Sequence, residues 1–199
     1  MSTIQDADAP TALERGLAAR LRAEREARGW SLSDLATRSG VSRAMISKVE
    51  RAEASPTAAL LGRLSGAFGL TLSALLARAE GDAAGVGRVM RRALQPTWRD
   101  PATGYIRRAV SPPEADPELV HVALPPKARV AFPAAAYRHL RGQCIWVLGG
   151  TLVFREGAVE HRLGEGDCLT LGPASDCAFD NPSDEPCTYL VAVSRLQKS

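Results

Sequence analysis

The sequence predicts two domains of different class, an all-α domain toward the N-terminus and an all-β domain toward the C-terminus. Three features of the 199-residue chain indicate this division. Apolar residues recur at helical spacing over 11–78, glycine and arginine are frequent over 79–104, and short β-rich runs separated by Pro, Gly, Asn and Asp fill 105–195. Two small domains joined by a linker suit a chain of this length.

The first predicted helix covers residues 11–28. Thr11 and Glu14 form a capping box after a proline, and an apolar stripe that includes Leu17 and Leu21 runs toward a closing glycine. We interpret the many arginines of this helix mainly as a solvated polar face, because glutamates are interleaved with them.

Residues 31–52 predict two short helices joined by a tight turn. Ser31 caps the first helix with Asp34 as a short-armed capping-box partner, and Gly40 ends it in the left-handed conformation. Ser42 caps the second helix. Three apolar residues of that helix are expected to face inward, namely Met45, Ile46 and Val49. The geometry is that of a helix-turn-helix, although a helical hairpin of another all-α domain is an alternative.

The pattern G-V-S-x-x-x-I-S-x-x-E over residues 40–50 resembles the Xre (phage-repressor-like) helix-turn-helix family. Ala52 stands where that family often has glycine. The resemblance implies a five-helix domain that binds double-stranded operator DNA, with the second of these short helices in the major groove. The residues expected to contact DNA are Ser42, Arg43, Ala44, Ser47, Lys48, Arg51 and Thr57.

Two further helices complete the predicted domain. Ser55 and Pro56 are interpreted as the N-cap and first residue of a fourth helix, which Gly69 ends. Thr71 caps a short fifth helix. Residues 79–104 are interpreted as a linker, with a basic strap against DNA or a partner subunit as the alternative.

Nine β-rich runs between residues 105 and 195 predict a sandwich or barrel. The segments QCIWVLGGTLVF and LGEGDCLTLGPASDCAFDN resemble the two conserved stretches of the cupin family. This resemblance implies a double-stranded β-helix, which is a jelly-roll barrel. We expect Gly149 and Gly150 to form a hairpin turn, Gly164 to begin the next corner, and Trp146 and Phe179 to lie in the barrel core.

The cupin resemblance also indicates where a metal would bind, because catalytic cupins use two His and a Glu from the first motif and a His from the second. These positions correspond here to Tyr137, His139, Gln143 and Cys177. Gln is a weak ligand, and a tyrosine must lose a proton with a pKa near 10 to bind a metal well. We therefore expect no metal and no cofactor, and a pocket in which these four side chains bind a small-molecule effector. A soft metal shared by His139 and Cys177 remains an alternative.

Charge and cysteine content agree with a DNA-binding end joined to a different domain. Net charge is +2 over residues 1–80, +4 over 81–110 and −3 over 111–199. The first ten residues lack the apolar core of a signal peptide, and no run of 18 apolar residues occurs. The four cysteines show no C-x-x-C pair, so we expect free thiols in a cytoplasmic protein that does not contact membranes.

An Xre domain followed by a cupin resembles a class of bacterial repressors. We therefore expect a homodimeric transcriptional regulator, a repressor controlled by a metabolite in the barrel, and no enzymatic activity. Two alternatives are a metal-dependent cupin enzyme of the epoxidase or dioxygenase type with an appended helix-turn-helix, and a constitutive DNA-binding protein whose barrel only dimerises.

Overall fold

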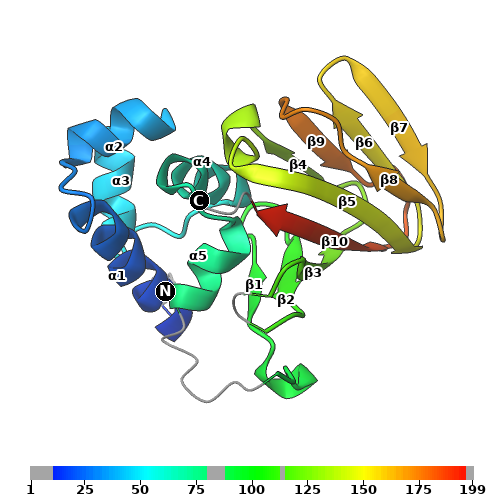
Figure 1. The fold of residues 1–199 in the computed structure, drawn as a ribbon, viewed down its shortest axis with the longest axis horizontal. Helices are drawn as coiled ribbons and strands as arrows, with labels where there is room; N and C mark the ends of the chain where they lie inside the picture. The colour runs from blue at the N-terminus through cyan, green and yellow to red at the C-terminus, as the bar shows by residue number, and fades with distance from the viewer. Residues whose placement is uncertain (1–10, 80–87, 113–114, 196–199) are drawn as a thin grey trace, which may run out of the picture.

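The computed structural model describes residues 11–79, 88–112 and 115–195, in which five helices pack beside two antiparallel sheets (Figure 1). The helices are α1 (Ala12–Glu26), α2 (Leu32–Ser39), α3 (Arg43–Glu50), α4 (Ala58–Phe68) and α5 (Leu72–Ala79), with short 3-10 turns η1 (Arg92–Leu94) and η2 (Ala134–Ala136). The strands are β1 (Thr97–Arg99), β2 (Ile106–Ala109), β3 (Glu118–Leu124), β4 (Arg129–Phe132), β5 (Leu140–Gly149), β6 (Leu152–Glu156), β7 (Val159–Leu163), β8 (Cys168–Thr170), β9 (Cys177–Asp180) and β10 (Cys187–Arg195).

Capping residues define the helix ends much as predicted. The capping boxes of Thr11 with Glu14 and of Ser31 with Asp34 are both present. Gly40 and Gly69 end α2 and α4 with φ angles of 66° and 69°, in the left-handed region that glycine adopts without strain. These local signals were readable because each depends on residues only a few positions apart.

Two predictions for the helical domain are wrong. The fourth helix begins at Ala58, and its N-cap is Thr57, whose hydroxyl accepts from the Leu60 amide. The Ser55 hydroxyl donates to the carboxylate of Glu14. Met45 is 38% exposed and does not face the core, since the inward positions of α3 belong to Ile46 and Val49.

The arginines of α1 are also not a simple solvated face. Arg20 and Arg28 on α1 and its C-terminal turn, together with Arg78 on α5, surround the carboxylate of Glu24, which is 5% exposed. Burial alone would raise the pKa of Glu24, but the hydrogen bonds from these guanidiniums outweigh burial and lower it to about 2. This ion cluster ties the first helix to the last helix of the domain.

The C-terminal domain consists of a six-stranded sheet in the order β1-β2-β3-β10-β5-β8 and a four-stranded sheet in the order β4-β9-β6-β7. All nine predicted β-rich runs form strands. Phe179 of β9 lies in the core between the sheets. The centroid of its ring is 5.6 Å from that of the stacked Tyr189 ring and 4.8 Å from that of the Phe154 ring. The predicted two-sheet jelly roll is therefore confirmed.

Three details of the barrel differ from expectation. Trp146 is 47% exposed on the outer face of β5, because Ile145 and Val147 occupy the inward positions. Gly150, with a φ angle of 83°, lies between β5 of one sheet and β6 of the other, so the expected hairpin is a corner between sheets. Strand β1 lies inside the predicted linker, of which residues 80–87 fall outside the described part of the chain.

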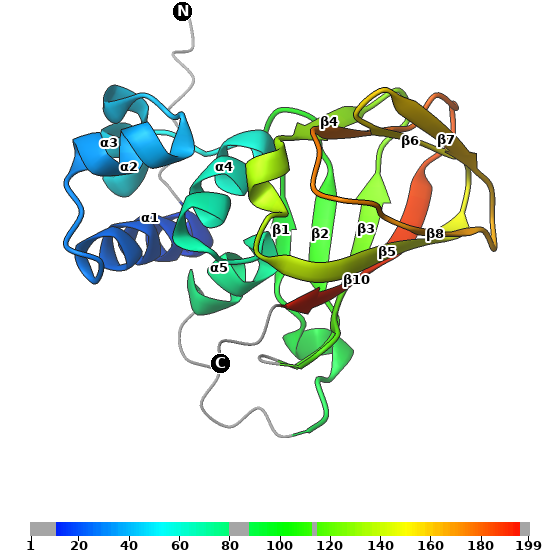
Figure 2. The same ribbon diagram turned by 45° about the horizontal axis from the view of Figure 1, so that its top comes forward.

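The helical domain docks on the barrel through α4 and α5 (Figure 2). A Cβ atom on Gly62 would lie 2.7 Å from the ring of Phe132 in β4, and one on Gly66 would lie 2.6 Å from the carbonyl oxygen of Ala135 in η2. The contact continues at the cap of α5, where the Thr71 hydroxyl donates to the buried Glu118 carboxylate at 2.8 Å.

Among the described helices, none is by itself long and apolar enough to cross a membrane. Only α4 and α5 taken together meet the length and composition, and they meet at an angle of 94°.

Candidate nucleic-acid interface and ligand pocket

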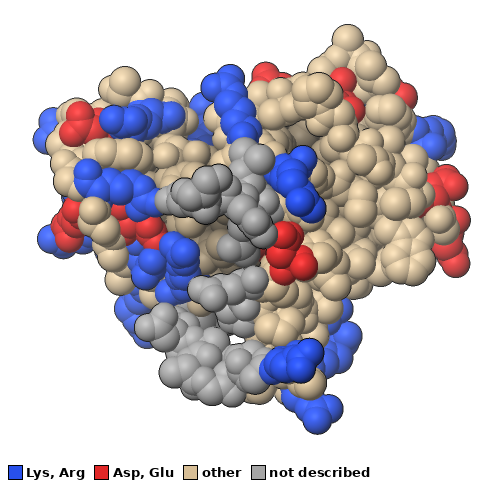
Figure 3. Space-filling model, in the orientation of Figure 1, with Lys and Arg blue, Asp and Glu red and all other residues tan. Residues whose placement is uncertain are grey.

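Helix α3 presents its outer face at the surface of the helical domain. The Ser42 hydroxyl accepts a hydrogen bond from the Met45 amide at 3.2 Å, which fixes the first turn of the helix. Arg43, Ala44 and Lys48 are exposed. Figure 3 shows basic and acidic side chains interspersed over the helical domain, whereas much of the visible barrel surface is uncharged.

The inner face of α3 is held in place by apolar packing and by one largely buried ion pair. Ile46 and Val49 are almost fully buried. The Arg25 guanidinium of α1 donates to both carboxylate oxygens of Glu50 at 2.8 and 2.7 Å, and both side chains are largely shielded from solvent. A bidentate pair of this kind fixes orientation as well as position, so the outer face of α3 is held at a defined angle to α1.

The end of α3 folds back on itself through a left-handed residue. Ala52 has a φ angle of 56°, and the amides of Ala52 and Glu53 bond to the carbonyls of Val49 and Lys48 at 3.0 and 2.9 Å. This is a Schellman ending in which alanine takes the place that glycine fills more easily. The turn brings the Glu53 side chain back beside Arg51.

Two of the residues predicted to contact DNA are consequently tied to each other and to Glu53. Arg51 donates to the two oxygens of Glu53 at 2.6 and 2.7 Å, and also to the Ser47 hydroxyl. The hydrogen bond to Glu53 raises the pKa of Arg51. Sequence reasoning missed Glu53, because its contact with Arg51 depends on the left-handed turn at Ala52.

Thr57 also has a defined structural role. Its hydroxyl caps α4 by accepting a hydrogen bond from the Leu60 amide at 3.3 Å, and its side chain is half-buried. The first amides of α4 lie beside it, and amides at a helix N-terminus are suited to a phosphate.

We predict that Glu53→Gln strengthens binding to random DNA by roughly 3- to 10-fold, because it releases Arg51 to contact a phosphate. The dependence of log affinity on log salt should steepen by about one unit. Fluorescence anisotropy across a salt series measures both quantities. Glu165→Gln, which removes an exposed carboxylate from the barrel, is the matched control for net charge. Equal slopes for Glu53→Gln and the parent would show that Glu53 does not restrain Arg51.

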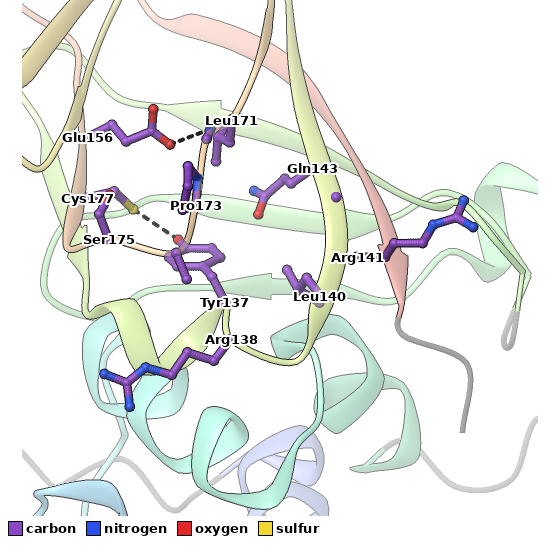
Figure 4. A pocket seen from close by; sticks show the side chains of 13 residues that line it. Tyr137, Arg138, Leu140, Arg141, Gln143, Glu156, Leu171, Pro173, Ser175 and Cys177 are labelled. Carbon is purple, nitrogen blue, oxygen red and sulfur yellow. Dashed lines mark hydrogen bonds between the residues drawn. The ribbon is translucent and has the colours of Figure 1, made fainter. Parts of the chain in front are cut away.

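Within the barrel, a cavity of about 200 Å³ lies between β5, the end of η2 and the segment leading into β9 (Figure 4). Three of the four residues predicted to bind ligand line it, namely Tyr137, Gln143 and Cys177. Gln143 points into the cavity, whereas Arg138 and Arg141 point away from it (Figure 4). His139 is not among the lining residues, because the chain leaves the η2 turn there before the alternation of β5 begins.

The cavity is lined by neutral hydrogen-bonding groups together with three charged residues, Arg138, Arg141 and Glu156. The Cys177 thiol donates to the Tyr137 hydroxyl at 3.2 Å. Burial raises the pKa of Cys177 to about 11 and raises the pKa of Tyr137 well above its ordinary value. Both groups are therefore protonated at neutral pH. Glu156 also lines the cavity, and its carboxylate accepts from the Gly172 amide at 2.9 Å.

No group of three or more His, Cys, Asp or Glu residues is placed to hold a metal ion in the part of the chain that the structure describes. The protonated states of Tyr137 and Cys177 fit a metal poorly, because a metal binds the deprotonated forms.

Sequence reasoning also missed Arg107, which faces the barrel interior from β2. A signal was available, since Arg107 and Arg108 are adjacent on a strand and successive side chains of a strand point to opposite faces. One of the two arginines therefore had to point inward.

Comparison with known proteins identifies both domains. Residues 21–75 match the helix-turn-helix family HTH_3, and residues 120–193 match the cupin domain family Cupin_2. The chain is a helix-turn-helix protein with a cupin domain.

Relatives of this helix-turn-helix and cupin protein include a curated regulator and a solved structure. The HTH-type transcriptional regulator SutR of Escherichia coli K12 is 42% identical over 64 residues, which are 32% of this chain and 36% of SutR. The match thus spans about a third of the length of that relative. The crystal structure of an HTH_3 family transcriptional regulator from Vibrio cholerae has the same fold, with a TM-score of 0.76 and 20% identity over 94% of this chain and 100% of that one.

A structure of hydroxypropylphosphonic acid epoxidase from S. wedmorenis is less similar. Its TM-score is 0.45 at 18% identity, over 90% of this chain and 97% of that one. A likeness of this size says nothing about the activity of the present cupin domain.

Proposed function

We propose that this protein is a transcriptional regulator that binds double-stranded operator DNA through α3 and responds to a small metabolite in its cupin cavity. The observation that carries the proposal is the outer face of α3, where exposed Arg43 and Lys48 sit on a helix anchored by Ile46, Val49 and the Arg25–Glu50 pair. A helix held in this way can enter the major groove without rearranging. We further propose that it acts in the cytoplasm as a homodimer and represses its target.

In the proposed DNA complex, Arg43 lies in the first turn of α3 and can pair with guanine O6 and N7. Ser47 lies one helical turn after Arg43, beside the next base step. Its hydroxyl can contact a base after its hydrogen bond with Arg51 has broken. Lys48 and Arg51 hold phosphates. A two-fold dimer would read half-sites about 10 base pairs apart.

We predict that Arg43→Ala weakens operator binding by roughly 1 to 3 kcal/mol and weakens binding to random DNA much less, because it removes a base contact. Lys48→Ala is the matched comparison, since loss of a phosphate contact weakens both kinds of DNA to a similar extent. Operator selected from a random library and titrated by anisotropy supplies the measurement. An equal loss on operator and on random DNA would remove Arg43 from base recognition.

The cavity supports the proposal of a bound effector over that of a barrel that only dimerises. A closed apolar cavity of about 150 Å³ can hold benzene, so about 200 Å³ admits a metabolite of roughly six to ten non-hydrogen atoms. The lining offers a phenol, an amide and a thiol beside the carboxylate of Glu156, and this mixture suits a small polar molecule.

We infer that the cupin domain is not a metal-dependent enzyme, because protonated Tyr137 and Cys177 occupy two of the positions where a metal cupin has ligands. We predict that the purified protein carries less than about one tenth of an equivalent of iron, manganese or nickel, and that chelator leaves operator binding unchanged. Elemental analysis tests this. Stoichiometric metal that is lost in His139→Ala would support the enzyme alternative instead.

A further inference from the structure

A second, inner cavity of about 40 Å³ lies where the barrel meets the helical domain. Ser65 and Thr71 line it from the helical side, and Tyr105 and Arg107 line it from the barrel side. It shares Tyr137, Leu140 and Gln143 with the larger cavity, so these three side chains stand between the two spaces. A molecule in the larger cavity could therefore extend one end past them.

The guanidinium of Arg107 is the only charged group that lines this inner cavity among the described residues. It donates to the Tyr105 hydroxyl at 3.1 Å and to the Ser73 hydroxyl of α5 at 2.8 Å. Its Nε is buried and has no hydrogen-bond partner in the described structure. Two of the five N–H groups of the guanidinium are thus used, both on neutral oxygens.

No carboxylate of the described residues lies within ion-pair distance of Arg107. None of the ion pairs found within residues 11–79, 88–112 and 115–195 includes it. Glu118 is close enough for its field to reach Arg107, but its carboxylate already accepts from Thr71. A charge withdrawn from water is stable when it is paired and fully hydrogen-bonded. Arg107 is half-buried and has an unpartnered buried Nε, so it has unused capacity for an anion.

Apart from Glu118, the groups around Arg107 are neutral, and they include further unused hydrogen-bonding atoms. Burial raises the pKa of Tyr105 and of Tyr189, so both phenols remain protonated. The Tyr189 hydroxyl and the Gln143 amide oxygen are buried and have no hydrogen-bond partner within the described chain. The amide of Gln143 can turn to present its NH₂ group instead, which would donate to an anion.

We propose that the effector carries a carboxylate, and that this group enters the inner cavity and is held by Arg107. A carboxylate is planar and matches the fork of a guanidinium with two parallel hydrogen bonds. The inner cavity has room for a group of only a few atoms, which favours a carboxylate over the bulkier tetrahedral phosphate or sulfate. The rest of the effector fills the larger cavity beside Gln143 and Cys177.

Arg107 would also transmit the effect of ligand binding to the helical domain. Arg107 bonds Ser73 on α5, and Glu118 bonds Thr71 at the start of α5, so two polar contacts join this helix to the barrel beside the inner cavity. A carboxylate that draws the guanidinium toward itself changes the contact with Ser73. This inference rests on the proposed function for the consequence at the operator, whereas carboxylate binding itself does not depend on it.

The test uses the full-length protein and calorimetric titration with acetate, propionate, glycolate, lactate, pyruvate, glycine and the 2-oxo acids of up to five carbons. Each acid is compared with its primary amide, and inorganic phosphate and sulfate are included. We expect at least one acid to bind at least tenfold more tightly than its amide and than either inorganic ion. Failure of every acid, or equal binding of acid and amide, would overturn the proposal without need of any variant.

Variants then locate the site. Arg107→Lys keeps the charge but loses the fork, and we expect at least tenfold weaker binding of that acid. Arg108→Gln, on the next residue and the opposite face of β2, is the matched control and should bind within about twofold of the parent. Unchanged binding in a folded Arg107→Lys protein would contradict the assignment.

A last pair of measurements separates this inference from the proposed function. Ser73→Ala should bind the acid with an affinity within about threefold of the parent. In this variant the acid should no longer change the affinity for operator DNA, whereas coupled sites typically change each other's affinity by about 5- to 150-fold. An acid that binds through Arg107 yet leaves operator affinity unchanged in the parent would preserve the carboxylate site and contradict metabolite control. If only neutral metabolites changed operator affinity, metabolite control would be supported and the carboxylate site would be contradicted.

Discussion

Helix α4 approaches the barrel so closely that side chains are excluded at two of its positions. Cβ atoms at Gly62 and Gly66 would collide with the ring of Phe132 and with the backbone of Ala135. Helix α4 also packs against α2 of the helix-turn-helix (Figure 2). One helix therefore contacts both the helix-turn-helix and the cupin barrel, and its close packing fixes their relative position.

This packing links the inner cavity of the barrel to the helices that we propose bind DNA. The inner cavity is bounded by residues of both domains, and Arg107 and Glu118 of the barrel bond to Ser73 and Thr71 beside it. A ligand can shift the position of α3 only if it binds one arrangement of these contacts more tightly than another. Because packed interfaces tend to switch between discrete arrangements, a small change at Arg107 would, in the dimer we propose, alter the spacing of the two α3 helices.

The sequence predicted what depends on short-range patterns, and it failed where long-range packing decides. The capping boxes, the ends at Gly40 and Gly69 and all nine β-rich runs were predicted correctly. The continuous apolar run around Trp146 does not reveal which residues face inward, so Trp146 was misplaced. The pairing of Arg51 with Glu53 requires a left-handed turn at an alanine, and the inner cavity at Arg107 exists only because two domains meet there.

The close packing of α4 on the barrel is expected to make the helical domain and the barrel unfold as one cooperative unit. Differential scanning calorimetry of the full chain tests this most directly, in parallel with Gly66→Val, which inserts a side chain where a Cβ would already lie 2.6 Å from a carbonyl oxygen. We expect a single endotherm for the parent and two separate endotherms for Gly66→Val, because the domains of the variant would unfold independently. Two resolved endotherms in the parent, unchanged in the variant, would contradict it.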